Sequence, residues 1–170
     1  MTATTGITLG GLLTALLVLI ANLRPWYVGG REMKKLAPFS KGFAAAVCAA
    51  ACPGGILGWA HTHTGGVANT VGEKTGAAAT GTAPAAALSR GQLVGLGMTG
   101  ACIVALAVFL VYLAWKAAGK EDKRRIFGGA YVGTVFVGTA GVAGALSWVP
   151  GALNAAGQSV VDAFNGTGIL

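Results

Sequence analysis

Four long apolar stretches, separated by short charged clusters, most strongly constrain how this chain can fold. They cover residues 6–23, 42–60, 92–115 and 126–149. A helix that spans a bilayer needs about 20 predominantly apolar residues, and each stretch is close to that length. The sequence therefore predicts an all-α integral membrane protein with four transmembrane helices.

The composition favours a membrane protein over a soluble helical bundle. Of the 170 residues, 54% are hydrophobic and only 10% are charged, and the mean hydropathy is +0.69. A soluble bundle needs polar faces on its surface helices, and the apolar stretches lack them. Glycines are dense in the last stretch, where small residues would let helices approach closely in lipid. These glycines are Gly128, Gly129, Gly133, Gly138, Gly141 and Gly144.

The positive charges predict the orientation of the chain, whose net charge is +7. Two basic turns are expected, one after the first stretch and one after the third. Their basic residues are Arg31, Lys34, Lys35, Lys120, Lys123, Arg124 and Arg125. Because positively charged loops stay in the cytoplasm, both turns are expected inside, and both termini outside, a bacterial inner membrane. The same charges would also suit anionic phospholipid headgroups or nucleic acid.

An internal repeat organises the chain. Residues 30–35 resemble 119–125, residues 55–59 resemble 144–148, and residues 69–73 loosely resemble 158–162. The offset is close to 89 residues, the separation of Trp59 from Trp148. This pattern predicts one membrane hairpin in residues 1–75, an Ala/Gly/Thr/Pro linker in 76–91 and a second hairpin in 92–170. Because each copy has two spans, the repeats would be parallel in the membrane.

Aromatic residues mark the ends of the predicted spans. Trp26, Trp59, Trp115 and Trp148 all fall where a span is expected to meet the headgroups, which is the usual place for amphipathic rings. After Trp148, a set of apolar residues recurs with helical spacing: Leu153, Ala156, Val160 and Phe164. This pattern predicts a short amphipathic helix that lies on the outer membrane surface or against a neighbouring subunit.

No catalytic, cofactor or metal site is predicted, so an enzyme is not expected. Cys48, Cys52 and Cys102 fall at membrane depth, where free cysteine behaves as a small apolar residue. His61 and His63 begin an outer segment without nearby acidic or cysteine partners and are interpreted as interfacial residues. No Asp or Glu lies deep in a predicted span. This excludes a rotary-ATPase proteolipid, which needs a mid-membrane carboxylate.

Residues 93–146 resemble the pilin subunits of conjugative type IV secretion systems. The resemblance rests on a glycine-containing apolar helix, a Lys/Arg-rich turn and a second Gly/Ala helix. It implies a homo-oligomer that is stored in the inner membrane and assembled into an extracellular filament, with lipid between subunits and secretion-system components as partners. Lys120, Lys123, Arg124 and Arg125 would form the lumen turn, with Arg31, Lys34 and Lys35 as its counterpart. Two departures are the second hairpin and the lack of a basic leader region.

The sequence therefore favours a non-enzymatic structural subunit of a membrane channel, pilus or DNA-transfer assembly. One alternative is a phage holin-like pore-former, which would keep its termini in the cytoplasm. Another is a small transporter or accessory subunit, which would need a polar pocket between spans. The candidates for such a pocket are Asn22, Thr99 and Thr134.

Overall fold

The computed structural model describes residues 6–166 and contains seven helices in that part of the chain. They are α1 (Leu9–Val28), α2 (Met33–Ala50), α3 (Gly55–Thr80), α4 (Met98–Ala117), α5 (Lys120–Val137), α6 (Ala140–Ala145) and α7 (Val149–Phe164). The described residues form no β-strand beyond two isolated bridges. The predicted all-α class is therefore confirmed, and α7 occupies the place of the predicted C-terminal helix.

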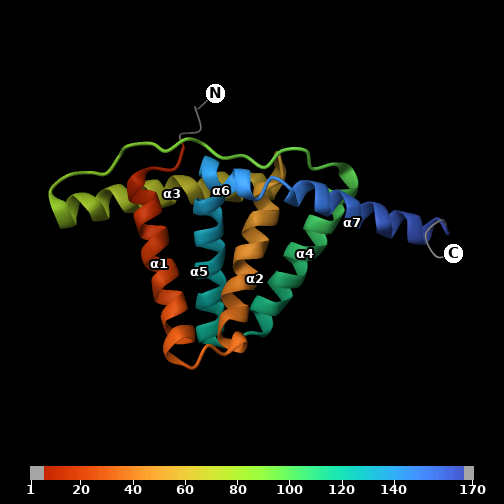
Figure 1. The fold of residues 1–170 in the computed structure, drawn as a ribbon, viewed down its shortest axis with the longest axis horizontal. Coiled ribbons are helices and arrows are strands. Elements are labelled where there is room, and N and C mark those ends of the chain that lie inside the picture. Colours follow the sequence, from red (N-terminus) through yellow and green to blue (C-terminus); the bar gives the residue numbers. More distant parts are fainter. Residues whose placement is uncertain (1–5, 167–170) are drawn as a thin grey trace.

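The helices form an upright row with a layer across one end (Figure 1). The row runs α1, α5, α2, α4, and neighbouring helices in it contact one another. Helices α3, α6 and α7 lie across the end at which α1 and α4 begin, which we call the layered end. The turns that follow α1 and α4 lie together at the opposite end, which we call the basic end.

Glycines bring the two inner helices, α2 and α5, into close contact. A Cβ atom on Gly42 would collide with the carbonyl of Ile126, and one on Gly129 would collide with the carbonyl of Phe39. A Cβ on Gly133 would lie 2.9 Å from that of Ala46. Small residues at such positions let helix backbones approach each other. The predicted role of glycine in close packing therefore holds on α5. A Cβ added at Gly141 or Gly144 of α6 would instead meet no described atom within 4 Å beyond its own stretch of helix.

The outer helices, α1 and α4, carry most of the exposed apolar surface of the row. Of the described helices, these two are long and apolar enough to cross a membrane by themselves. Only 17% of the most apolar segment of α1, and 11% of that of α4, is buried inside the protein. Helices α2 and α3 would add a third span if the bent pair were counted as one. By length and composition, two of the four predicted spans are therefore supported.

The second and fourth predicted spans do not form continuous helices. The stretch 42–60 contains a break between α2 and α3, whose axes differ by 111°. Pro53 cannot donate a helical hydrogen bond, and Gly55 has a φ of +68°, a conformation that favours glycine. The stretch 126–149 is interrupted after Val137, where α5 ends, and it includes the short helix α6.

The charged turns are shorter than the sequence predicted, because most of their residues are helical. Pro25 lies in the last turns of α1, and Pro38 lies inside α2. Helix α5 begins at Lys120, and its first turn holds Glu121 and Asp122. Acidic side chains at that position interact favourably with the helix dipole, so the charged cluster extends the helix towards its N-terminus instead of ending it.

The predicted linker is partly helical and partly an ordered strap. Helix α3 continues to Thr80, and residues 81–97 then cross the layered end in an extended course (Figure 1). The backbone N–H groups of Leu9 and Gly10 donate to the carbonyls of Ala86 (2.9 Å) and Pro84 (3.0 Å). The first N–H groups of a helix lack partners within the helix. The strap therefore caps α1 as well as connecting the two halves.

The helices of the two halves of the row interlock. Helix α1 packs mainly on α5 and α3, whereas α4 packs mainly on α2 and α7. Each outer helix thus contacts the inner helix of the other half more than its own sequence neighbour. Helices α3 and α7 leave the centre of the layer in opposite directions and extend beyond α1 and α4 (Figure 1).

Two asparagines make equivalent contacts in the two halves. Asn69 of α3 accepts from the backbone N–H of Thr8 at 2.8 Å, and Asn154 of α7 accepts from that of Gly97 at 2.8 Å. Thr8 and Gly97 are the N-cap residues of α1 and α4. The sequence repeat aligns Asn69 with Gln158. In the structure, however, the counterpart of Asn69 is Asn154, which lies four residues earlier.

Candidate functional site

The structure gathers the predicted basic residues at the basic end. In the first turn, the guanidinium carbon of Arg31 lies 5.2 Å from the centre of the Tyr27 ring, and Arg31 has a φ of +60°. Lys35 pairs with Glu32 at 3.5 Å and donates to the carbonyl of Gly29 at 3.1 Å. Lys34 is exposed. The first basic turn is thus held by local contacts and presents its charge to the surroundings.

The second basic turn joins the first through a side chain. Arg125 donates to the backbone carbonyl of Lys35 at 3.1 Å and lies 3.9 Å from Glu121. Lys123 lies 5.3 Å from the centre of the Trp115 ring. Lys120 and Arg124 are exposed. Basic residues far apart in the sequence therefore lie together at the basic end.

The four tryptophans occupy the two ends of the row. Trp26 and Trp115 lie near the ends of α1 and α4, at the basic end, and Trp59 and Trp148 belong to the layered end. Trp59 and Trp148 are 60% and 64% exposed. Two tryptophans therefore lie at each end of the row, and their position at membrane interfaces remains a prediction.

A groove between α1 and α5 connects the basic end to an apolar surface. Its apolar part has a volume of about 390 Å³ and its basic mouth about 440 Å³. The two parts share Val18, Phe127 and Gly128, and the mouth adds Lys123 and Arg124. An apolar channel with cations at one end has the chemistry that an anionic amphiphile requires.

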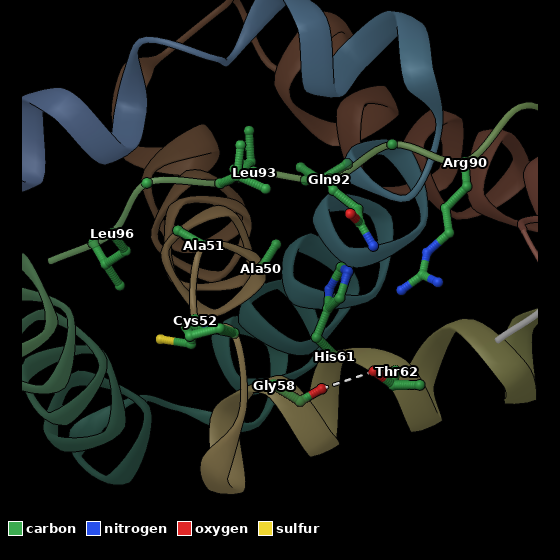
Figure 2. Close-up of a pocket in the computed structure, with 15 residues that line it drawn as sticks. Ala50, Ala51, Cys52, Gly58, His61, Thr62, Arg90, Gln92, Leu93 and Leu96 are labelled. Atoms are coloured by element: carbon green, nitrogen blue, oxygen red, sulfur yellow. Dashed lines mark hydrogen bonds between the residues drawn. The ribbon is translucent and has the colours of Figure 1, made fainter. Parts of the chain in front are cut away.

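A second cavity lies at the bend between α2 and α3, beneath the strap (Figure 2). Its volume is about 340 Å³. Ala50, Leu93, Leu96 and Val137 supply apolar walls, and His61, Arg90, Gln92 and Cys52 supply polar atoms. In Figure 2 the imidazole of His61, the guanidinium of Arg90 and the amide of Gln92 approach the same space. We call this cavity the bend pocket.

His61 and His63 have different environments, although the sequence suggested one interfacial role for both. His63 stacks on Trp59 with ring centres 4.1 Å apart, and it is exposed. His61 lines the bend pocket, and its buried Nδ1 has no hydrogen-bond partner among the described residues. Burial lowers the pKa of His61 below its ordinary value, and the positive charge of Arg90 lowers it further.

The inward position of His61 could have been predicted from helical spacing. Gly58, His61, Gly65, Ala68 and Gly72 follow one another at intervals of three and four, the spacing of one helix face. A stripe of small residues indicates a packed face, so a histidine within it points inward. The contribution of Arg90 and Gln92 could not be seen in the same way, because it depends on the path of the strap.

The other polar candidates do not converge. Asn22 lies at the mouth of the groove, Thr99 donates to the carbonyl of Asn154 at the layered end, and Thr134 is buried within α5. Of the cysteines, Cys52 lines the bend pocket and Cys102 is exposed on α4. Cys102 is therefore not packed against the other described helices.

Among the cavities of the described structure, the groove and the bend pocket are lined by Lys or Arg side chains. The groove places cations beside an apolar channel, and the bend pocket places Arg90 beside a histidine that lacks a partner at Nδ1. No protein-family model, curated protein or solved structure matches this chain.

Proposed function

We propose that this chain is a non-enzymatic structural subunit that oligomerises in a bacterial inner membrane, as part of a channel, pilus or DNA-transfer assembly. One observation carries the proposal. The inner pair of helices is closed by glycine contacts, while the outer faces of α1 and α4 and the far end of α7 leave apolar side chains uncovered. Such a unit offers surfaces to lipid and to further copies of itself.

All four helices of the row cross the membrane in this proposal. Helices α2 and α5 have 18 residues each, which corresponds to about 27 Å at 1.5 Å per residue. That length is close to the roughly 30 Å hydrocarbon core of a bilayer. Both helices begin with charged residues at the basic end, where long Lys and Arg side chains can reach the headgroups. Because α2 and α5 lie between α1 and α4 in the row, the outer helices would shield the less apolar surfaces of α2 and α5 from lipid.

The charge distribution supports a cytoplasmic basic end. The seven predicted basic residues belong to the two turns and the helix starts beside them, all at one end. Positively charged segments are retained on the cytoplasmic side. The layered end and both termini would then face outward. The resemblance to secretion pilins would make the basic turns the lumen turns of an assembled filament.

Helix α7 is the surface that we expect to contact another subunit. Leu153 packs against the apolar cluster at the layered end. Further along the same face, Val160 is 46% exposed and Phe164 is 88% exposed. An apolar face that begins in the core and continues uncovered beyond the row is suited to a neighbouring subunit or to the outer leaflet.

Membrane lipid, including anionic phospholipid, is the second expected partner. The groove between α1 and α5 would hold an acyl chain along Leu17, Val18 and Tyr131, with the headgroup near Lys123 and Arg124. Cationic groups near a membrane surface attract anionic lipid by about 1 kcal/mol each.

The test is the mass of the purified protein in a mild detergent, measured by light scattering after size-exclusion chromatography. We expect the wild type to elute as an oligomer and the double variant Val160→Asp, Phe164→Asp to shift towards the monomer. Ser159→Asp is the matched control, because it adds a charge to the same exposed helix outside this apolar face. A monomeric wild type, or an equal effect of the control, would refute the proposed oligomer surface.

A further inference from the structure

The bend pocket contains an unusual pair of side chains for a site near apolar helices. Arg90 carries a permanent positive charge, and the residues that line the pocket include no carboxylate. His61 contributes a buried Nδ1 without a hydrogen-bond partner among the described residues. Buried polar atoms in proteins are nearly always hydrogen-bonded, so this nitrogen marks a place where an additional group would be accommodated.

The electrostatic balance of the pocket favours an anion. The carbonyl ends of α2 and α5, near Ala50 and Val137, each contribute about half a negative charge at most. The guanidinium of Arg90 contributes a full positive charge, and protonation of His61 would add a second. The amide of Gln92 offers hydrogen-bond donors on the same side of the pocket (Figure 2). Arginine presents several N–H donors in a planar fork that fits phosphate oxygens.

The size of the pocket indicates more than a lone ion. Its volume of about 340 Å³ lies at the lower end of the range for small-molecule sites, about 300–1,000 Å³. Leu93, Leu96 and Ala50 give it an apolar wall beside the polar groups. A molecule that combines a phosphate group with a small apolar portion would match both surfaces.

We propose that the bend pocket binds a phosphate group, with Arg90 and His61 as its principal ligands. The phosphate belongs either to a phospholipid headgroup at the outer membrane surface or to a small soluble phosphate compound. His61 donates from Nδ1 to a phosphate oxygen, and Gln92 donates from its amide. This site lies at the opposite end of the row from the basic turns and does not depend on the proposed oligomer.

Nuclear magnetic resonance of the full-length protein in a phosphate-free maltoside detergent tests the proposal. The probes are inorganic phosphate and a short-chain phosphatidylglycerol, each at constant ionic strength set with chloride. The readout is the imidazole ¹⁵N shifts of His61, with His63 as the internal control because it lies outside the pocket. We expect a saturable change at His61 with at least one probe and little change at His63.

Two variants assign the binding to the pocket. Arg90→Gln should weaken phosphate binding at least tenfold, whereas Lys74→Gln removes an exposed cation of the same outer side and should leave binding unchanged. Arg90→Lys keeps the charge and should give an intermediate affinity if loss of the arginine fork matters. The retention volume of each variant on size-exclusion chromatography shows whether it is folded.

The outcomes are distinguishable. A response to inorganic phosphate indicates a soluble phosphate compound, and a response to phosphatidylglycerol alone indicates a lipid headgroup. No response of His61 to either probe, or wild-type affinity in folded Arg90→Gln, would overturn the proposal. The two outcomes that would overturn the phosphate site do not change the mass of the assembly. This inference can therefore fail while the proposed function holds.

Discussion

Single glycines on α5 set the distance between the two inner helices. A Cβ at position 129 would meet the carbonyl of Phe39, which belongs to the backbone of α2 and cannot rotate away. We therefore expect Gly129→Ala to destabilise the protein by about 1–3 kcal/mol, the usual cost of overpacking a core. Unfolding in detergent, followed by circular dichroism, measures the change.

Gly144→Ala is the matched control for this substitution. Position 144 is also helical and has no described atom within 4 Å of an added Cβ. Alanine is a better helix former than glycine by roughly 1 kcal/mol, so this variant should be as stable as the wild type or more so. Equal destabilisation of both variants would contradict the packing that we describe.

Asn69 ties the start of α1 to α3 through buried hydrogen bonds. Its side chain accepts from Thr8 N at 2.8 Å and donates to the carbonyl of Gly6 at 3.0 Å. Asn69→Ala would leave buried backbone groups unpaired, so we expect a loss of about 1–3 kcal/mol in the free energy of unfolding. Asn154→Ala removes the equivalent bonds at a more exposed position and should cost less. A larger loss for Asn154→Ala would contradict this account.

His61 should make stability depend on pH in phosphate-free detergent. Because burial and Arg90 lower its pKa in the folded protein, the unfolded chain binds more protons as the pH falls below about 6.5, the usual histidine value. The contribution of His61 to stability is therefore complete above that pH and is lost on acidification. His61→Gln should reduce the acid-induced drop in melting temperature, whereas His63→Gln should not. An unchanged drop in His61→Gln would contradict the buried environment.

At the scale of elements, hydropathy located the helices but misplaced several ends. Positions 51–55 read as part of an apolar span, although Pro53, Gly54 and Gly55 were a visible signal for a break. The start of α5 was missed for the opposite reason, because charged residues that lower hydropathy are good helix formers. Apolarity reports where a chain can be buried, whereas helix ends depend on capping and backbone geometry.

The bend pocket and the interlocked packing lay beyond sequence reasoning for a different reason. The repeat suggested two hairpins packed side by side, but α1 contacts α5 more than α2. Which helices become neighbours depends on small-residue contacts such as that of Gly42 with Ile126. Those contacts join residues far apart in the sequence, and a single sequence does not reveal them.

For the whole molecule, the helix contacts suggest how the two halves of the chain become one unit. Helices α1 and α4 each pack against the inner helix of the other half, and the strap crosses the layered end between them. The halves therefore cannot separate without exposing the glycine contacts of α2 and α5. We interpret the subunit of the proposed assembly as this complete row of four helices.

The orientation of the molecule is tested by reporters fused to its ends. We expect a periplasmic alkaline phosphatase fused after Leu170 to be active, and one inserted between Gly29 and Gly30 to be inactive, because positively charged loops are generally retained in the cytoplasm. The reverse pattern would favour the holin-like alternative, which keeps its termini inside.

The central claim is that several copies of this chain form one assembly in the membrane. Native mass spectrometry of the wild-type protein, released directly from membrane vesicles, measures the number of copies without prior separation. The account predicts a defined multiple of 16.8 kDa, together with any bound lipid. A single species at the mass of one chain, under conditions that preserve a known membrane oligomer, would contradict it.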